Sequence, residues 1–170
     1  MSPTVLQGQF TVCITERPIE ETAFELSSQL TADGEPLLIL DAAGCFEPSR
    51  MSPATPGLAR HLHILRAASS SELEEICSGL LSAQLHVQSR RALVVGLLNH
   101  LYDPQMLTRD AARALGRIKS QLWTLVESGL EVVVCETGNG NPGTRAHFLP
   151  SLCASAHQVL EYRDHAISVS

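Results

Sequence analysis

Few residues in this sequence combine the types and the spacing that chemistry requires. His61 and His63 lie two residues apart, which places both imidazoles on one face of a strand, as metal ligands sometimes are. No cysteine or carboxylate with ligand spacing accompanies them, so we predict strand histidines without a metal. Ser69 precedes Glu72 by three residues, and this helix capping box explains the serine without catalysis. The sequence has no Gly-x-Ser-x-Gly motif, and its spacing suggests no Ser/His/Asp arrangement.

A glycine-rich stretch, Gly138 to Gly143 (GNGNPG), has the backbone freedom that a phosphate-binding loop needs. Such a loop normally opens directly onto the N-terminus of a helix, and no helical pattern follows immediately here. A lone G-x-G is a weak motif. The residues alone therefore predict a plain loop.

The densest positive charge follows Gln105 in a long helical pattern. Arg109, Arg113 and Arg117 recur every four residues opposite an apolar face, and we call them the arginine stripe. The chain's one lysine, Lys119, follows closely. A stripe of this kind is usually only solvated, but it is also the first candidate for binding an acidic partner or a DNA backbone. Both interpretations stay open.

The elements that must position these residues alternate between two kinds of pattern. Short runs that are apolar throughout predict buried strands at Phe10–Ile14, Leu37–Leu40, Leu62–Leu65, Ala92–Leu97 and Glu131–Cys135, with two more at His157–Tyr162 and Ala166–Val169. Apolar residues at helical spacing predict helices at Ile19–Leu30, from Ser69 to Leu85, and from the N-cap Asp103, with Pro104 behind it, to Gly129. This alternation predicts an α/β fold: a doubly wound, mainly parallel sheet with helices on both faces.

Length and composition set the class of the molecule. The 170 residues suit one domain, which we place at 1–170 with its core at about 8–163, and the 44% apolar fraction is typical of a globular chain. No apolar run approaches the ~18 residues of a transmembrane helix, and no signal-peptide pattern opens the chain. Five dispersed cysteines without a CxxC pair predict reduced core thiols in a cytoplasmic protein, or a nuclear one in a eukaryote. The net charge of −6 argues against nonspecific electrostatic binding of nucleic acid by the molecule as a whole.

Three segments at strand ends resemble the RecA/RadA recombinase superfamily. LILDAAGCFEPSRM is similar to the segment after the family's second core strand, and the residues that match its frame are Asp41, Gly44, Phe46, Pro48 and Arg50. RALVVGLLNHLYD resembles the family's Walker B strand and the segment that follows this strand. SGLEVVVCETGNGN resembles the strand that leads into its second DNA-binding loop. Because the three segments keep the family's order over nearly the whole chain, the resemblance implies a single RecA-type ATPase domain.

At the position of the Walker A loop, GxxxxGK[ST], the sequence departs from the family. The matching segment runs from Thr15 to Thr22 (TERPIEET), where Thr15 and Glu20 replace the glycines and Glu21 replaces the lysine. With Glu16, these glutamates set three negative charges where a triphosphate would lie, and like charges ~4 Å apart repel by ~4 kcal/mol near a protein surface. We therefore expect no nucleotide cofactor.

Two further catalytic positions are also replaced. The family's catalytic glutamate falls at Ala43 and its Walker B aspartate at Gly96, so the base that activates water and a Mg²⁺ carboxylate are both missing. Together with Glu21, these replacements predict a protein without ATPase activity. An ordinary Rossmann-like domain, with the alignment misplaced, is the alternative.

The resemblance implies a pseudo-ATPase that serves as an accessory or regulatory subunit in DNA recombination or repair. Its partner would be a second copy, in a dimer, or another RecA-like protein, in a hetero-complex. Long filaments are not expected, since the linker by which recombinases self-assemble has no counterpart in this sequence. Single-stranded DNA is a second candidate partner. It would be contacted by the arginine stripe and by Arg145, His147 and Phe148, because the family's second DNA-contacting loop leaves the sheet there. Two alternatives stay open: a RecA-fold regulator that acts through protein contacts only, like certain bacterial cell-division inhibitors, and a divergent active NTPase.

Overall fold

The strands of the molecule form one sheet in this computed structural model, which describes residues 8–46, 59–138, 143–163 and 166–169. The strands are β1 (Phe10–Thr15), β2 (Leu37–Asp41), β3 (Leu62–Arg66), β4 (Arg91–Val95), β5 (Glu131–Thr137), β6 (Gln158–Arg163) and β7 (Ala166–Val169). Their order in the sheet is β3-β2-β4-β5-β1-β6-β7. Neighbouring strands from β3 to β6 run parallel, and β7 pairs antiparallel with β6. The predicted mainly parallel sheet is confirmed.

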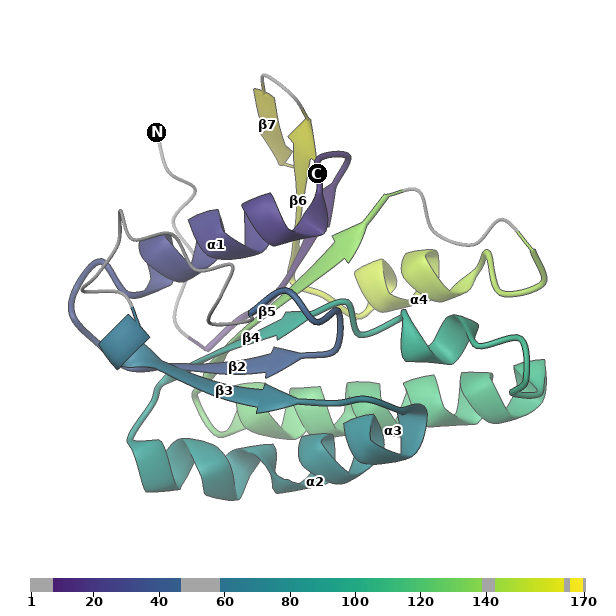
Figure 1. The fold of residues 1–170 in the computed structure, drawn as a ribbon, viewed down its shortest axis with the longest axis horizontal. Coiled ribbons are helices and arrows are strands. Elements are labelled where there is room, and N and C mark those ends of the chain that lie inside the picture. Colours follow the sequence, from purple (N-terminus) through teal and green to yellow (C-terminus); the bar gives the residue numbers. More distant parts are fainter. Residues whose placement is uncertain (1–7, 47–58, 139–142, 164–165, 170) are drawn as a thin grey trace.

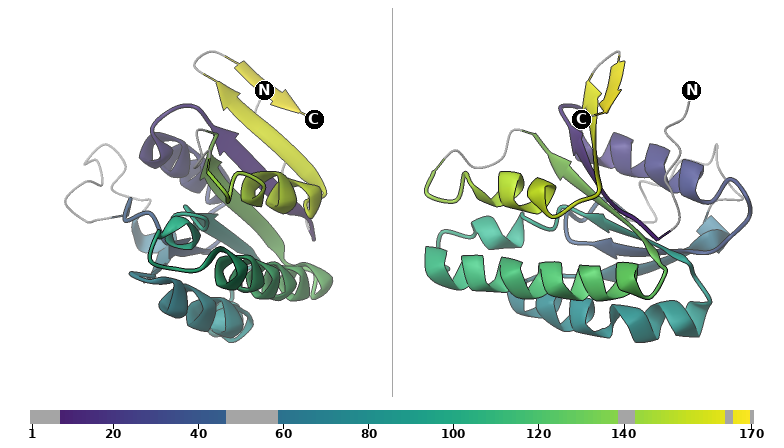
Figure 2. Two further views of the ribbon diagram at one scale, coloured as in Figure 1. Left: turned by 90° about the vertical axis from the view of Figure 1, so that its right-hand side faces the viewer. Right: turned by 180° about the vertical axis from the view of Figure 1, so that it is seen from behind.

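Helices cover both faces of this sheet, as the alternation of patterns predicts (Figures 1 and 2). On one face lies α1 (Ile19–Leu30). On the other lie α2 (Ser70–Val87), α3 (Thr108–Glu127) and the short α4 (Phe148–Ala154). The chain is therefore an α/β protein whose arrangement is consistent with a doubly wound fold.

Two clusters of buried apolar residues, one on each face of the sheet, explain why the central strands do not alternate between apolar and polar residues. In β5, Val132 and Val134 pack with the side chains of α2, α3 and α4, whereas Val133 and Cys135 pack on the α1 side. All four are fully buried. Burial of a valine-sized side chain contributes about 1.5–3 kcal/mol, so a polar residue on either face would cost stability.

Helix α2 begins where the capping box predicts. Ser69 Oγ accepts the backbone N–H of Glu72 at 3.2 Å, and Glu72 Oε2 accepts the N–H of Ala68 at 2.7 Å. These side-chain acceptors satisfy backbone donors that have no partner within the helix.

Helix α3 begins later than predicted, at Thr108 rather than after Asp103. Asp103 Oδ1 accepts the N–H of Gln105 at 2.9 Å, so Asp103 and Pro104 form a turn instead of a helix start. Ahead of this turn, the 3₁₀ turn η3 (His100–Tyr102) follows β4. Aspartate with a following proline suits both structures, and the sequence pattern does not separate them.

Three smaller details also differ from the sequence predictions. His61 belongs to a 3₁₀ turn, η2 (Ala59–His61), that precedes β3, so His61 and His63 do not share a strand. Strand β4 ends at Val95, because Gly96 leaves the strand with a φ of +69°. Helix α4 was not predicted, since its seven residues include Pro150 and give too short a pattern to show a helical period.

Four of the five cysteines are buried, in agreement with the prediction of core thiols. Burial raises the pKa of the Cys13 and Cys77 thiols to about 12, and Glu74 contributes to the rise at Cys77. Thiols with such values carry almost no thiolate at neutral pH and are poor nucleophiles. Within the described ranges, no helix is both long and apolar enough to cross a membrane. The same residues include no group of His, Cys, Asp and Glu that could hold a metal ion.

Candidate functional site

The carboxyl ends of β1 and β5 lie where an open α/β sheet usually binds its ligands. β1 leads into α1 on one face, whereas its neighbour β5 leads toward α4 on the other. The two connections diverge at this edge, which makes it a topological switch point. The predicted degenerate phosphate loop, Thr15 to Thr22, lies here, at the end of β1 and the start of α1.

The connection from β1 to α1 is short and closed by side-chain hydrogen bonds. Residues 16–18 alone separate the two elements. Thr15 Oγ1 lies 2.8 Å from Thr22 Oγ1, and both threonines are buried. The same Thr15 oxygen accepts the N–H of Arg17 at 3.0 Å. These bonds hold the two ends of the segment together.

Other backbone donors of this connection are also used inside the protein. The N–H of Glu16 donates to the carbonyl of Tyr162 at 3.0 Å, and the N–H groups of Glu21 and Thr22 donate to the carbonyl of Pro18. Pro18 has no N–H to offer. A phosphate cradle needs several such donors to point at one anion, and here they point at carbonyls.

Acidic side chains dominate the surface of the same segment. Residues 15–25 contain four glutamates and one arginine, Arg17. Arg17 lies 3.0 Å from Glu25 and 3.8 Å from Glu21, while Glu16 has Arg163 of β6 at 3.9 Å. The glutamates outnumber their cationic partners, so the potential here repels a polyphosphate.

Ala43 and Gly96 occupy the two positions where the resemblance places the catalytic glutamate and the Walker B aspartate, and they pack against each other. A Cβ added to Gly96 would lie 2.7 Å from the Cβ of Ala43 and 2.9 Å from Nδ2 of Asn99. The N–H of Ala42 donates to the carbonyl of Val95 at 2.9 Å, which keeps the two loops at this separation. The backbone of Gly96, with its φ of +69°, also favours glycine. No carboxylate fits at position 96 in this conformation.

Asp41, the aspartate of the family-like motif, binds its own loop. The residue is 1% exposed, and its carboxylate accepts three backbone N–H groups at 2.9–3.2 Å, those of Ala43, Cys45 and Phe46. This carboxylate therefore shapes the turn after β2. Pro48 and Arg50, which belong to the same motif, lie outside the described residues.

Glu136, near the end of β5, is a buried acid that the sequence analysis did not single out. Burial raises its pKa to about 8, and backbone hydrogen bonds from the segment after β4 only partly oppose this rise. One of these bonds runs from the N–H of Leu98 to Glu136 Oε1 at 3.0 Å. A charged residue directly after the apolar run VVVC was the available signal. Glu136 thus ties β5 to the segment after β4.

Arg145 and Phe148 do not form the surface that was predicted to contact DNA. Arg145 is 6% exposed, and its guanidinium donates to three backbone carbonyls, those of Leu101, Asp103 and Met106. Phe148 is fully buried and stacks on Tyr102, with ring centroids 6.2 Å apart. His147 alone is exposed. Both buried side chains support the protein's own loops, which argues against the role predicted for them.

The arginine stripe lies on the outer side of α3, as predicted, but it is partly neutralised. Glu74 of α2 binds Arg117 through two hydrogen bonds, at 2.7 and 3.0 Å. Arg109 is highly exposed, with Asp110 Oδ1 3.8 Å from its Nε, and exposed Arg113 has no ion pair in the part of the chain that the structure describes. Lys119 lies away from the stripe and donates to a serine hydroxyl of α4. Arg109 and Arg113 are the members of the stripe that remain available to a partner.

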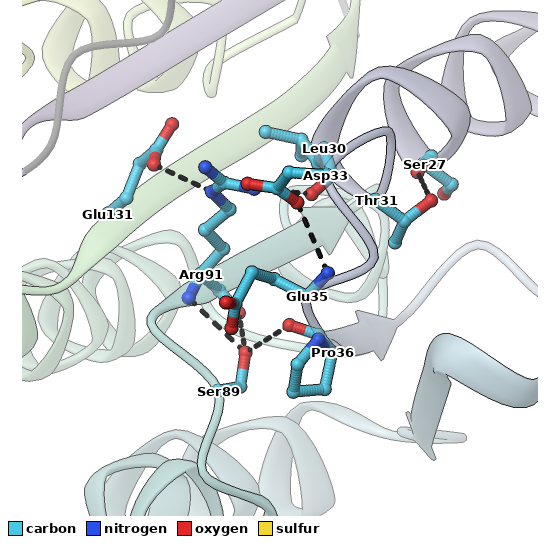
Figure 3. Close-up of polar contacts among 9 residues, drawn as sticks. All are labelled: Ser27, Leu30, Thr31, Asp33, Glu35, Pro36, Ser89, Arg91 and Glu131. Carbon is cyan, nitrogen blue, oxygen red and sulfur yellow. Dashed lines mark hydrogen bonds and ion pairs between the residues drawn. The ribbon is translucent and has the colours of Figure 1, made fainter.

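A second polar cluster surrounds Arg91 at the opposite edge of the sheet, where β4 and β5 begin (Figure 3). The Arg91 guanidinium donates to the carbonyl of Leu30 at 2.7 Å and lies 2.8 Å from Asp33 Oδ2. Its Nε donates to Glu131 Oε2 at 3.1 Å. A pocket of about 310 Å³ opens here between the turn before β2 and the first residues of β4 and β5. The sequence analysis missed this cluster because its members come from three separate segments.

Glu131 is the deepest ionisable group of this cluster, with a side chain that is 3% exposed. Burial raises its pKa, and the attraction of Arg91 lowers the pKa less than burial raises it. The pKa of Asp33, which lies at the surface, is lowered. Its slight burial acts to raise this pKa, but the hydrogen bond from the N–H of Glu35 and the attraction of Arg91 together lower it by more.

Comparison with known proteins assigns no family to the chain, because neither a protein-family model nor a curated protein matches it.

Proposed function

We propose that this chain is a non-catalytic subunit with a RecA-type fold that acts by binding another protein, as an accessory or regulatory component of DNA recombination or repair. The observation that carries the proposal is the hydrogen bond between Thr15 and Thr22, 2.8 Å long and buried. It closes the β1–α1 connection where a phosphate loop would have to open around an anion. The assignment to the RecA type rests on the resemblance of three segments to that superfamily.

Two further features support a pseudo-ATPase. The contact between Ala43 and Gly96 fills the space in which a catalytic base and a metal carboxylate would have to stand. The glutamates of the β1–α1 segment repel the ligand that the family binds. Binding and hydrolysis of ATP are thus disfavoured by separate parts of the same edge.

Protein contact is favoured over DNA contact because two of the residues predicted to contact DNA are buried. Arg145 and Phe148 bind and pack against the protein itself. The net charge is −6. Leu107, 57% exposed at the N-cap of α3, and exposed Arg109 in its first turn put an apolar and a cationic side chain on the surface at this end of the helix. This combination suits an acidic protein surface with an apolar centre.

The proposal is tested in two arms with the full chain. Calorimetry with ATP and Mg²⁺ should show no saturable binding, whereas a Kd in the range of about 1 µM or tighter would contradict it. In the second arm, the tagged chain and two charge-reversal variants are purified from native extract. Arg113→Glu should lose a protein partner that the wild-type chain retains.

The matched control is Arg60→Glu, which makes the same charge change at another exposed position, in η2. If both variants keep the partner, or both lose it, α3 is not the binding surface. A retained partner that is itself a RecA-like protein supports the recombination pathway. A partner of another class supports a RecA-fold regulator outside that pathway.

A second candidate function, contact with single-stranded DNA, is favoured by one observation: the exposure of Arg109 and Arg113. Two phosphate contacts would make log affinity fall with log salt at a slope of about −1.4, and Arg113→Ala would reduce the magnitude by about 0.7. No binding at low salt would eliminate this candidate.

A further inference from the structure

We propose that the outer surface of α2 and α3 binds a second copy of this chain, in a dimer whose two-fold axis stands perpendicular to the two helices. The inference rests on the proposed function in one respect, the binding of a protein at α3, and it names the partner. The two helices lie side by side on one face of the sheet (Figures 1 and 2). Because each returns from the end of one parallel strand to the start of another, they run in the same direction.

The first step of the argument is the distribution of charge over this surface. Three glutamates lie in the first half of α2, and the arginine stripe lies on α3. Arg117 Nε lies 2.7 Å from Glu74 Oε2, whereas exposed Glu75 and exposed Arg113 have no ion pair among the described residues. A two-fold axis between the helices sets α2 of one copy on α3 of the other, so that opposite charges meet twice. The surface is therefore complementary to itself.

The second step is the position of the exposed large apolar side chains. Among the described residues these are Leu85, near the end of α2, and Leu107, at the N-cap of α3. The pair of Glu74 and Arg117 fixes how far one helix is shifted along the other. At ~1.5 Å per residue, Leu85 lies about 16 Å beyond this pair and Leu107 about 15 Å before it. An axis that passes by the pair therefore brings Leu85 of each copy to the same height as Leu107 of the other.

The third step is a pocket of about 300 Å³ between the two helices, with Glu75 and Ser78 in its lining. Arg113 precedes Arg117 by about 6 Å along α3, and Ser78 follows Glu74 by about 6 Å along α2. The same axis therefore places Arg113 of the second copy over Ser78, about one helical turn from Glu75. An arginine that enters a pocket beside a carboxylate is a typical anchor of a protein interface.

The size of this surface sets the strength of the dimer. Helices of 18 and 20 residues are about 27–30 Å long and together about 20 Å wide, so the contact covers roughly 550 Å² on each copy. The total of roughly 1,100 Å² is near the lower end of specific interfaces, which bury ~1,200–2,000 Å². Exposed ion pairs add little affinity but fix the register. We therefore expect a reversible dimer with a Kd on the order of 10 µM.

The experiment is sedimentation equilibrium of the purified full chain from about 1 to 300 µM, over which it should pass from monomer to dimer. Arg113→Glu and Glu75→Arg should each raise the Kd about tenfold or more, because each variant's dimer contains two repulsive contacts. Arg60→Glu, the same charge change in η2, is the matched control and should keep the wild-type Kd. A chain that stays monomeric throughout, or a dimer that both α2 and α3 variants leave unchanged, overturns the inference.

Mixing the two single variants tests the two-fold arrangement itself. In a heterodimer of Arg113→Glu with Glu75→Arg, both contacts again join opposite charges. The mixture should therefore dimerise at about the wild-type Kd, although neither variant does so alone. The double variant in one chain should behave in the same way. Misfolding of a variant predicts no such recovery, and a mixture that stays monomeric overturns the arrangement.

The apolar contact is tested by Leu85→Ala and Leu107→Ala, each of which should raise the Kd about three- to tenfold. Unchanged dimerisation of both variants contradicts the register given by the axis.

These outcomes separate the inference from the proposed function. A monomeric chain that still retains a different protein from extract through Arg113 overturns the dimer and leaves the proposed function standing. A dimer that depends on Arg113 and Glu75 but also binds ATP tightly supports the inference and contradicts the proposed function.

Discussion

Gly96 combines two constraints that a single methyl group would violate. In Gly96→Ala, the new Cβ would stand 2.7 Å from the Cβ of Ala43, in a backbone conformation with φ of +69°. A left-handed conformation costs an alanine about 1–2 kcal/mol, and overpacking adds about 1–3 kcal/mol. We expect the free energy of unfolding, measured in urea, to fall by roughly 2–5 kcal/mol.

Gly79→Ala is the control for this substitution, because Gly79 lies in α2 with open space around its Cα. It should stabilise the protein by about 0.5–1 kcal/mol through helix propensity. A Gly96→Ala variant as stable as the wild type would show that the loops after β2 and β4 can separate freely. The double variant with Ala43→Gly should recover part of the loss.

Glu136 predicts how stability depends on pH. Its pKa is about 8 in the folded protein, against an ordinary value near 4.5. Between these values the unfolded chain releases a proton that the folded protein retains, so this residue's contribution to stability falls as pH rises. The limiting slope is about 1.4 kcal/mol per pH unit, and it vanishes above pH 8 and below 4.5.

Glu136→Gln should remove this dependence. The variant should gain stability relative to the wild type steadily from about pH 5 to 8, measured by urea unfolding at each pH. Other titrating groups contribute equally to both proteins and cancel in the difference. A difference that stays constant over this range would mean that Glu136 is ionised when folded.

At the scale of elements, the segment from η3 to α3 depends on Arg145. Its guanidinium binds three carbonyls between Leu101 and Met106. The turn between η3 and α3 has two further bonds, which run from the N–H of Met106 to the carbonyl of Asp103 and from the N–H of Gln105 to Asp103 Oδ1. We expect Arg145→Ala to raise hydrogen exchange at residues 101–107 while β5 stays protected, with a loss of about 1–3 kcal/mol. Arg145→Lys should restore little of the lost stability, because an ammonium group cannot donate to the three carbonyls in the geometry of the planar guanidinium. Unchanged exchange would show that the turn holds itself.

Most helices and strands were predictable from the sequence, because apolar residues follow one pattern in buried strands and another in helices. The strand at 131–137 is apolar from Val132 to Cys135 because both faces of the sheet are buried there, and the helix at 19–30 shows one apolar stripe because only one of its sides is buried. The start of α3 was not predictable, since Asp103 suits a helix cap and a turn equally well. Nor were the roles of Arg145 and Glu131, which depend on partners 39 or more residues away. The type and spacing of residues indicate which chemistry is possible. Whether a charged side chain binds a partner molecule or another part of the same protein depends on the packing of the fold.

At the scale of the whole molecule, the order of the strands predicts an order of protection. β1 and β5 are paired on both sides at the centre of the sheet, whereas β3 pairs only with β2 and is partly exposed. Amides of β1 and β5 should exchange through global unfolding alone, and those of β3 through local opening as well. Exchange measured by mass spectrometry should therefore be faster in residues 62–66 than in 131–135. Equal rates would indicate that the sheet opens as one unit.

The packing of Ala43 on Gly96 also bears on how this sequence can change over time. To accept a carboxylate at position 96, the chain would first need a different backbone path there and a wider gap to the loop after β2. Either substitution alone would lower stability, and a loss of a few kcal/mol is a large fraction of what a domain possesses. Intermediate sequences with only one of these changes should thus be less stable than the present one. Under the proposed function, this contact would keep the chain to uses of the fold that need no carboxylate at position 96.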